Sequence, residues 1–382
     1  MDFKTNHKRL EIGEGKTSGY LSIFIGACSF LFSVSLFFPE ILTTSEFRGF
    51  YTEGFLQIFF LSLFFLGLGF ALTSFILRKK ADIAILGLAF LVGSLILNYL
   101  VPERTPGFYS TFSIGLDWLV LDIFFTAAIF IPIELFLPKH LDQSKFHPEW
   151  RTDLAYFIYS HLLVQALGII IRTPAIISFS GLPIAEIHTA VSSIAFPLQL
   201  LIALVVSDLF QWTIHFLFHK VPFLWRFHAI HHSIKNIDWL AGSRIHFVDL
   251  ILVRSFTFIP LYVLGFSTPV FLTYLVWVSI QAVLAHSNTK LNFGFLRYLL
   301  VTPQYHHWHH AADPKYYDKN FAIHFPFIDM IFGTYYLPGK KWPAGTGVHE
   351  ASYPKGFIKQ SIYPFTKSPF DTDLNMEERS DR

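Results

Sequence analysis

Residues 20–39 read YLSIFIGACSFLFSVSLFFP and contain no charged side chain. An α-helix of about 20 apolar residues matches the roughly 30 Å hydrocarbon core of a lipid bilayer. The run is too long for the apolar part of a signal peptide, and no A-x-A cleavage motif follows it. We therefore expect this stretch to form a retained membrane-spanning helix.

Further apolar runs follow along the chain. They cover residues 55–77, 83–101, 116–137, 154–171, 194–206 and 247–285. The last run is long enough for two helices and contains Gly265 and Pro269, so it predicts a helical hairpin. Together with the first run, these segments predict an all-α, polytopic membrane helical bundle with about eight membrane helices.

The composition of the 382-residue chain agrees with this expectation. Hydrophobic residues make up 53% and charged residues only 15%, whereas soluble domains carry about 25% charged residues. Lys and Arg number 29 against 27 Asp and Glu, so the chain has no basic excess for binding nucleic acid. The single cysteine, Cys28, excludes an internal disulfide and a thiolate zinc cluster.

The positions of Lys and Arg predict the orientation, because cytoplasmic loops are enriched in both residues. Lys4, Lys8 and Arg9 place the N-terminus in the cytoplasm, and Arg78 after the second run fits the same side. Following the runs along the chain brings the histidine-rich segments to one face. We expect a multi-pass membrane protein with these histidines near the cytoplasmic face, in the inner membrane of a bacterium or the endoplasmic reticulum of a eukaryote.

Histidines are concentrated in one part of the chain. Eleven of the 18 lie between residues 215 and 310, namely His215, His219, His228, His231, His232, His246, His286, His306, His307, His309 and His310. Most of them form three boxes in which histidines are three or four residues apart, a spacing that puts imidazoles on one face of a helix. His246 and His286 stand singly between the boxes.

This pattern is typical of metal ligands. Burying so many imidazoles at a membrane face costs free energy of desolvation unless they are paired or coordinate a metal. Imidazole suits Zn, Cu, Fe and Ni. A structural zinc needs only four ligands, so the surplus favours a site with two metal ions. The ten predicted ligands are His215, His219, His228, His231, His232, His246, His286, His306, His309 and His310.

The remaining histidines are predicted to have ordinary roles. His7, His140, His147, His188 and His349 lie in predicted loops or tails, and His307 is out of register with its box. His161 lies in a predicted helix without a partner at a useful spacing. His324 follows the last box and is predicted at the surface, with support of a metal ligand as the alternative.

These segments resemble the fatty acid hydroxylase superfamily, the sterol desaturase group of integral membrane di-iron enzymes. The resemblance runs from about Asp208 to Thr334. The family's first box, D-x-x-x-W-x-x-H-x-x-x-H, is matched by residues 208–219, and its second, L-W-x-x-H-x-x-H-H-S, by residues 224–233. The T-P-x-x-H-x-x-H-H box is matched by residues 302–310.

Shorter segments of the family are matched as well. The single histidines of its R-x-H and H-S-N segments correspond to His246 and His286. The sequence departs from the family's pattern at a few other positions, which are Phe216, Phe247, Ala322 and Ile328. None of these departures removes a box histidine, so the resemblance implies that the ten predicted ligands hold metal.

The resemblance implies a membrane-bound, O2-dependent hydroxylase or desaturase acting on a C–H bond of a sterol, fatty acyl or other lipid. Its cofactors would be two iron ions, with zinc able to replace them in purified protein, and O2 would be the co-substrate. Polar side chains that could orient imidazole N–H groups are Asp208, Asn288, Asp318 and Asn320, with Asp249 and Asp329 as further candidates. The sequence is equally compatible with helix caps or loop hydrogen bonds at these positions.

Partners and domains follow from the same comparison. The chain has no haem-binding H-P-G-G segment, no G-x-G-x-x-G motif and no iron–sulfur cysteines, so an external ferredoxin or cytochrome b5-type electron donor is implied. We expect membrane helices extra to the family core over residues 1–193, a catalytic region over residues 194–338 and a polar C-terminal tail over residues 339–382.

Three other functions are compatible with a histidine-rich membrane protein. A metal-ion transporter or sensor also carries intramembrane histidines, but here the boxes lie at one face rather than along a path across the bilayer. A zinc hydrolase needs a Glu general base, and no box contains one. A non-catalytic lipid-binding relative is the third alternative, against which the intact boxes argue.

Overall fold

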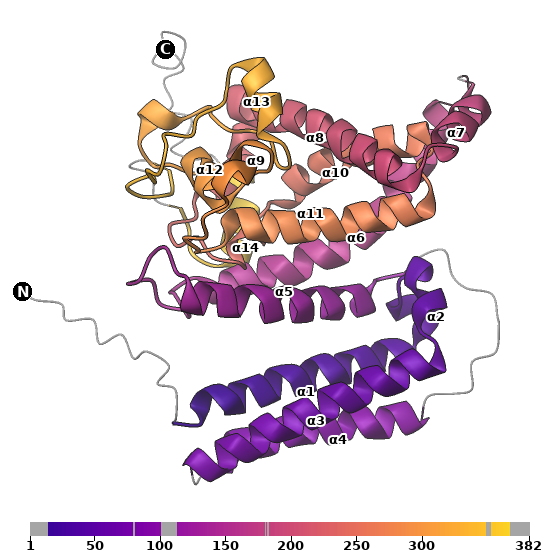
Figure 1. Ribbon diagram of the computed structural model, residues 1–382, viewed down its shortest axis with the longest axis vertical. Helices are drawn as coiled ribbons and strands as arrows, with labels where there is room; N and C mark the ends of the chain where they lie inside the picture. The colour runs from indigo at the N-terminus through magenta and orange to yellow at the C-terminus, as the bar shows by residue number, and fades with distance from the viewer. Residues whose placement is uncertain are drawn as a thin grey trace, which may run out of the picture. The chain divides into compact units, whose positions relative to one another are not determined.

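The computed structural model describes residues 14–78, 81–100, 113–179, 181, 183–348 and 353–366. Within these ranges the chain consists of helices and their connections, and its only β pairing is two isolated bridges, Pro138–Thr289 and Ala311–Thr346 (Figure 1). The N-terminal charges used to predict orientation, and also His7 and His349, lie outside the described residues.

Seven helices of the described part are long and apolar enough to cross a membrane. They are α1 (Lys16–Phe37), α3 (Glu53–Arg78), α4 (Asp82–Leu100), α5 (Leu116–Phe136), α8 (Phe196–Lys220), α10 (Phe247–Leu264) and α11 (Thr268–His286). They confirm a multi-pass, all-helical protein. The predicted run at residues 154–171 forms α6 (Trp150–Ser178), which does not meet the same criteria, so the estimate of about eight spans exceeds the seven found by one.

The predicted hairpin is confirmed. Helix α10 ends at Leu264, and the next residue, Gly265, adopts a left-handed conformation with φ 70°. Its N–H donates to the carbonyl oxygens of Leu261 and Tyr262, which satisfies the end of the helix. Helix α11 then begins at Thr268, with Pro269 in its first turn, where a missing N–H costs nothing.

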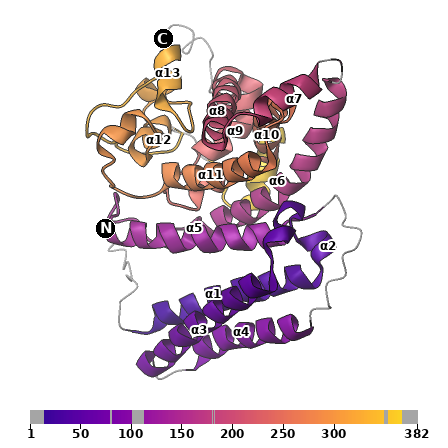
Figure 2. The same ribbon diagram turned by 45° about the vertical axis from the view of Figure 1, so that its right-hand side comes forward.

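The first of two compact units comprises residues 1–127 and 161–169. In it α1 packs against α3 and α4 (Figures 1 and 2). The backbones approach closely, since a Cβ atom on Gly26 would lie 2.8 Å from the carbonyl oxygen of Gly87. Ser29 and Ser33 of α1 bond the hydroxyl of Ser94 of α4 at 2.7 and 2.8 Å. Small and hydroxyl residues at such contacts are typical of helices packed within membranes.

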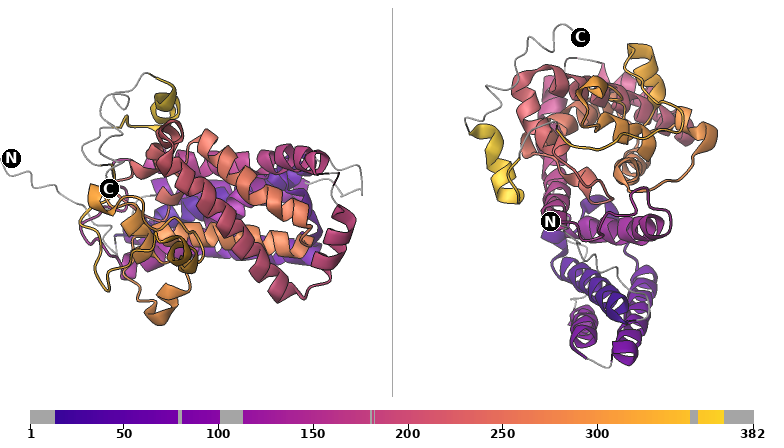
Figure 3. Two further views of the ribbon diagram at one scale, coloured as in Figure 1. Left: turned by 90° about the horizontal axis from the view of Figure 1, so that it is seen from above. Right: turned by 90° about the vertical axis from the view of Figure 1, so that its left-hand side faces the viewer.

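The second unit, residues 128–160 and 170–382, contains every histidine of the three boxes. Helix α8 packs against α9 (Pro222–His232), α10 and α11, and α11 also packs against α12 (Pro303–His309) (Figure 3). The shorter elements of this unit are α7 (Ile184–Ser192), η2 (Ala241–Ser243), η3 (Gly294–Tyr298), η4 (Pro314–Tyr316), α13 (Pro326–Phe332), α14 (Phe357–Ile362) and η5 (Tyr363–Phe365). Two other short elements, α2 (Pro39–Leu42) and η1 (Ser45–Phe50), belong to the first unit.

Part of the predicted polar tail is packed against the second unit. Helix α14 buries Gln360, and the ring of Phe357 lies 4.8 Å from that of Tyr156. The carbonyl oxygen of Ser361 lies 3.0 Å from Nε2 of His246. Residues 353–366 are therefore not a free tail, whereas the boundaries at residues 193 and 338 stay predictions.

Candidate metal centre

Nine of the ten predicted ligands form two buried clusters in the second unit. Cluster A consists of His215, His219, His228, His232 and His309. Cluster B consists of His231, His286, His306 and His310. Within each cluster, one ring nitrogen of every member lies within 4.8 Å of those of the others, which is close enough for all of them to contact one metal ion.

Helical spacing distributes the histidines between the clusters. On α9, His228 and His232 are four residues apart and share a face, while His231 lies about 100° away from His232 and joins cluster B. The assignment is reversed in the third box. There the outer pair, His306 and His310, belongs to cluster B, and His309 belongs to cluster A. The clusters are adjacent, since the rings of His232 and His310 stack at 4.5 Å.

Three members of cluster A are held in the protonation state that a metal ligand needs. Nδ1 of His215 lies 2.8 Å from the carbonyl oxygen of Phe321, and Nδ1 of His309 lies 2.8 Å from that of Lys319. Nδ1 of His228 lies 2.7 Å from the Asp249 carboxylate. Because these oxygens only accept, each Nδ1 carries the proton and each Nε2 keeps a lone pair. All three Nε2 atoms are buried without a hydrogen-bond partner.

Cluster B contains a contact that neutral imidazoles alone do not explain. Nδ1 of His231 donates to the carbonyl oxygen of Arg244 at 3.1 Å, and Nδ1 of His286 donates to that of Ala282 at 2.8 Å. Their Nε2 atoms therefore both carry lone pairs, yet they face each other at 3.3 Å. Two nitrogens about 2.1 Å from one ion and at right angles to each other are about 3.0 Å apart, so a shared cation fits this distance.

Five cluster histidines that lie outside the membrane-spanning helices are uncharged at neutral pH. Burial, and after it the neighbouring imidazoles, holds the pKa of His231, His232, His306 and His310 well below the usual range. Burial lowers the pKa of His309 to about 3. Neutral imidazole is the form that binds metal, so the clusters are prepared for a cation at neutral pH.

The predicted polar residues fall into two groups by what they contact. Asp249 bonds His228, and Asp318 lies 3.5 Å from Nδ1 of His219 and 2.6 Å from the Lys220 ammonium. These two contact the clusters directly. Asn288 does not, because its Oδ1 accepts the N–H groups of Lys139 and His140.

Asp208, Asn320 and Asp329 act on the backbone between α12 and α13. Asp208 accepts the N–H groups of residues 323, 324 and 325 at 2.8, 3.1 and 2.7 Å. Asp329 accepts those of residues 321 and 322 as well as Nε1–H of Trp212. Asn320, with φ 62°, donates to the carbonyl oxygens of Tyr305 and Tyr336. These bonds fix the segment whose Phe321 carbonyl orients His215.

The structure does not bring the tenth predicted ligand, His246, into either cluster. Its Nδ1 accepts the N–H of Val248 at 3.2 Å, which caps α10, and its Nε2 faces the Ser361 carbonyl. His307 is buried beside the ring of Trp342, 5.3 Å away, and is also outside the clusters.

One expectation for the remaining histidines is wrong, and another histidine has a partner on a different helix. His161 has no partner at a useful spacing on its own helix, but its Nε2 lies 2.6 Å from the Asp122 carboxylate of α5, within the first unit. His324 is not at the surface but fully buried. Asp122 lies on a different helix from His161, so spacing along the chain gave no signal for this contact.

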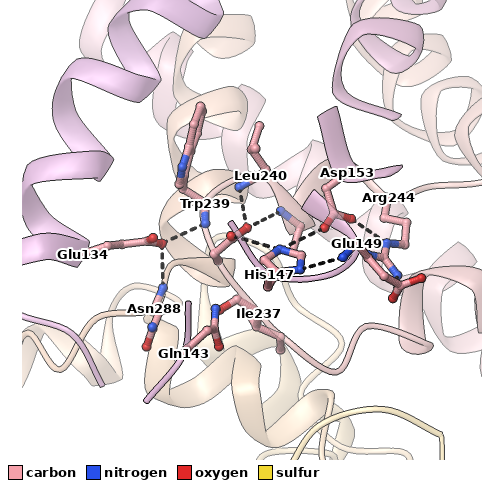
Figure 4. A network of polar contacts seen from close by, with 12 residues as sticks. Glu134, Gln143, His147, Glu149, Asp153, Ile237, Trp239, Leu240, Arg244 and Asn288 are labelled. Atoms are coloured by element: carbon pink, nitrogen blue, oxygen red, sulfur yellow. Dashed lines mark hydrogen bonds and ion pairs between the residues drawn. The ribbon is translucent and has the colours of Figure 1, made fainter. Parts of the chain in front are cut away.

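His147 joins a buried network of charges that the sequence did not reveal (Figure 4). Its Nε2 lies 3.3 Å from Asp153 and 3.2 Å from Asp238, a geometry that resembles a third metal site. However, Nδ1 of His147 accepts the N–H of Glu149, so Nε2 carries the proton and lies at ion-pair distance from the carboxylates. Arg244 completes the network by pairing with Asp153 and Glu149 at 2.6 and 3.0 Å.

This network supports cluster B through backbone groups. The carbonyl oxygen of Arg244 is the acceptor for His231, so fixing the guanidinium also fixes that acceptor. Glu134 accepts the N–H groups of Trp239 and Asn288 at 2.8 Å each (Figure 4). The second of these bonds holds the chain two residues after His286.

Comparison with known proteins agrees with this site. Residues 200–334 match the family described as fatty acid hydroxylase. Ornithine lipid hydroxylase OlsE of Rhizobium tropici is 27% identical over 281 residues, 72% of this chain and 85% of that protein. Mouse cholesterol 25-hydroxylase is 26% identical over 255 residues, 60% of this chain and 77% of that protein.

A third relative is methylsterol monooxygenase 1-2 of Arabidopsis thaliana, 23% identical over 203 residues, 50% of this chain and 66% of that protein. No solved structure matches significantly. Residues 200–334 form a fatty acid hydroxylase domain, which confirms the family resemblance. The chain is an integral membrane oxidoreductase of the lipid hydroxylase and desaturase class.

Proposed function

We propose that the chain is a di-iron, O2-dependent enzyme that hydroxylates or desaturates a C–H bond of a lipid, with clusters A and B each holding one iron. The relatives that support this substrate class are named for ornithine lipids and sterols, and another, from Xenopus tropicalis, is an alkylglycerol monooxygenase. The catalytic region would be residues 194–338, with residues 1–193 as additional membrane helices and residues 339–382 as a C-terminal extension.

The observation that carries the proposal is the pair His231 and His286 in cluster B. Two nitrogen lone pairs that face each other at 3.3 Å in a buried site repel unless a cation lies between them. Cluster A adds three further buried Nε2 atoms without partners. Nine histidines in two groups exceed what a structural zinc needs, which favours two redox-active ions.

Bound iron would supply, together with O2, the oxidising power that an unactivated C–H bond requires and that acid–base side chains lack. The chain's own contribution is to orient the ligands. Asp249 and the carbonyl oxygens of Phe321 and Arg244 hold Nδ1–H groups of three histidines, which leaves Nε2 free in each. All nine cluster histidines are buried.

Electrons for the reaction would come from a separate protein. The sequence contains no haem, flavin or iron–sulfur motif, so we propose a ferredoxin or cytochrome b5-type donor. The positive charges of the N-terminal segment favour a metal centre on the cytoplasmic side, where such donors are found.

Metal content tests the proposal directly. We expect about two irons per chain in protein purified in detergent under iron-replete conditions, and loss of both ions in His228→Ala/His231→Ala, which removes one ligand from each cluster. His246→Ala is the matched control, because this histidine lies outside both clusters, and it should keep its iron. Well-folded parent protein that binds no metal even after anaerobic iron reconstitution would contradict the di-iron site.

Activity distinguishes the proposal from a transporter. Parent protein with iron, an electron donor and O2 should convert a lipid to a product with one more oxygen or one more double bond, detected by mass spectrometry of total lipids. Transport of metal ions into sealed vesicles without any lipid product would instead favour the metal-transporter alternative.

A further inference from the structure

Arg254 lies in the middle of the membrane-spanning helix α10 and has no acidic partner in the described part of the chain. It follows Leu250 by four residues and precedes Phe258 and Leu261 by four and seven, so it lies on the face of α10 that is buried. Among the described residues, no carboxylate lies within 4 Å of its guanidinium. Its Nε is buried without a hydrogen-bond partner.

An unpaired arginine at this position needs an explanation. Charged side chains inside a membrane are costly, face the protein interior and pair with other charges or mark the path of a substrate. A guanidinium cannot give up its proton to escape the cost. The side chain keeps some accessible surface, and its guanidinium lies 5.6 Å from the ring of Phe258. A ligand can therefore still reach it.

Two further hydrogen-bond donors lie beside Arg254, one on α11 and one before α13. Tyr274 and His324 are both fully buried, and their rings meet edge to face at 6.4 Å. Ring contacts connect them to Arg254, since Phe258, one turn after Arg254, meets Phe271 at 5.5 Å and Phe271 meets Tyr274 at 6.3 Å. Neither ring nitrogen of His324 has a hydrogen-bond partner.

The protonation state of His324 makes this group a set of donors. Burial, and after it the Arg254 charge, lowers the pKa of His324 to about 3, so the imidazole is neutral and carries one N–H. The acidic group that also lies near Tyr274 is Asp208. Its oxygens already accept three backbone N–H groups, so it is not a contact partner for the guanidinium.

We propose that Arg254, Tyr274 and His324 bind the acidic group of the lipid substrate, a carboxylate or a phosphate. This inference rests on the proposed function and adds the substrate class to it. An acidic group supplies the negative charge that Arg254 lacks and the acceptor oxygens for the two neutral donors.

The subsite and the metal clusters belong to the same unit and share two supporting segments. Asp249, which holds His228 of cluster A, lies five residues before Arg254 on α10, about 7.5 Å along the helix axis. His324 lies three residues after Phe321, whose carbonyl holds His215. A lipid bound through its acidic group is therefore held in the unit that contains both metal clusters.

Binding to purified full-length protein tests the proposal without requiring activity. The probes are palmitate, its neutral methyl ester, and phosphatidic acid, measured by competition in a neutral detergent. We expect the parent to bind at least one of the acids at least tenfold more tightly than the ester, and the tighter acid identifies a carboxylate or a phosphate subsite. A parent that binds the ester as tightly as both acids overturns the proposal, and this arm needs no variant.

Substitutions test whether the preference for acids over the ester depends on Arg254. Arg254→Gln should weaken binding of the preferred acid about tenfold to a hundredfold, as expected for loss of a hydrogen bond to a charged group, and should leave binding of the ester unchanged. Arg254→Lys keeps the charge and should keep part of the preference. Arg151→Gln, an exposed arginine on α6, is the matched control and should behave like the parent. A folded Arg254→Gln protein that keeps the full preference overturns the proposal.

Iron content of the same samples separates this inference from the proposed function. Arg254→Gln should retain the metal, because Arg254 is not a member of either cluster. Iron retained without any preference for acids refutes only the acid subsite. Absence of iron from the parent refutes the di-iron enzyme, whatever the lipid preference.

Discussion

Removing the Asp208 carboxylate should destabilise the protein and empty cluster A. Asp208 is fully buried and accepts three N–H groups, one at Oδ1 and two at Oδ2. Each buried donor left without a partner costs about 1–3 kcal/mol. Asp208→Ala therefore loses roughly 3–9 kcal/mol, a large part of the 5–15 kcal/mol by which domains are usually stable.

Asp208→Asn should be milder, because the amide can keep its oxygen towards residues 324 and 325 and lose only the bond to Ile323. The expected cost is about 1–3 kcal/mol. Because this segment carries the Phe321 carbonyl that orients His215, metal affinity should fall together with stability.

Denaturant unfolding in detergent, followed by tryptophan fluorescence, and metal analysis of the same samples would measure both effects. Asp142→Asn, at an exposed position, is the control and should change neither. If Asp208→Ala unfolds within about 1 kcal/mol of the parent and keeps its metal, the role assigned to these three bonds is wrong.

Three further predictions follow from the contacts around the clusters. Asp249→Asn should weaken metal binding about 10- to 100-fold, because His228 loses the negative charge that fixes its Nδ1 proton. Isothermal titration with Fe(II) under argon measures the affinity. An affinity equal to that of the parent would contradict this role of Asp249. Arg244→Met should cost about 3–5 kcal/mol, since it leaves Asp153 buried without its cation; a melting temperature equal to that of the parent would refute this. Acidification should also destabilise the protein. The pKa of buried His309 is about 3 in the folded protein and about 6.5 in the unfolded chain. The contribution of neutral His309 to the free energy of unfolding is therefore complete above pH 6.5 and declines as pH falls towards 3, by up to about 1.4 kcal/mol per pH unit. A free energy of unfolding that stays constant from pH 7 to 5 would contradict this prediction.

The histidine boxes show how far spacing alone can predict a site. Separations of three and four residues identified eight histidines that the fold brings together, because they fix which side chains share a helix face, and the ninth, His286, came from the family's H-S-N segment. The sequence also identified His246, which the fold uses as the cap of α10 instead. A single histidine has no spacing pattern, so nothing local distinguishes a ligand from a cap.

The carboxylates show where local reasoning ends. Asp208, Asp249 and Asp329 were all candidates to orient imidazoles, but only Asp249 contacts one. The other two accept backbone N–H groups from a segment more than 100 residues away or from the turn beside it. Which of these roles a buried carboxylate takes depends on the groups that face it, and those come from other elements.

The sequence by itself determined the membrane-spanning helices and the family, because length, hydropathy and residue spacing are local properties of the chain. Only the tertiary structure decided that adjacent histidines such as His231 and His232 serve different clusters, since each needs partners from α8, α11 or α12. It also decided that His147 lies in a charge network and that Arg254 lacks an acidic partner among the residues that the structure describes. The energy of a charged side chain depends on its burial and on its partners. Both are set only when the chain folds, because they come from distant parts of the sequence.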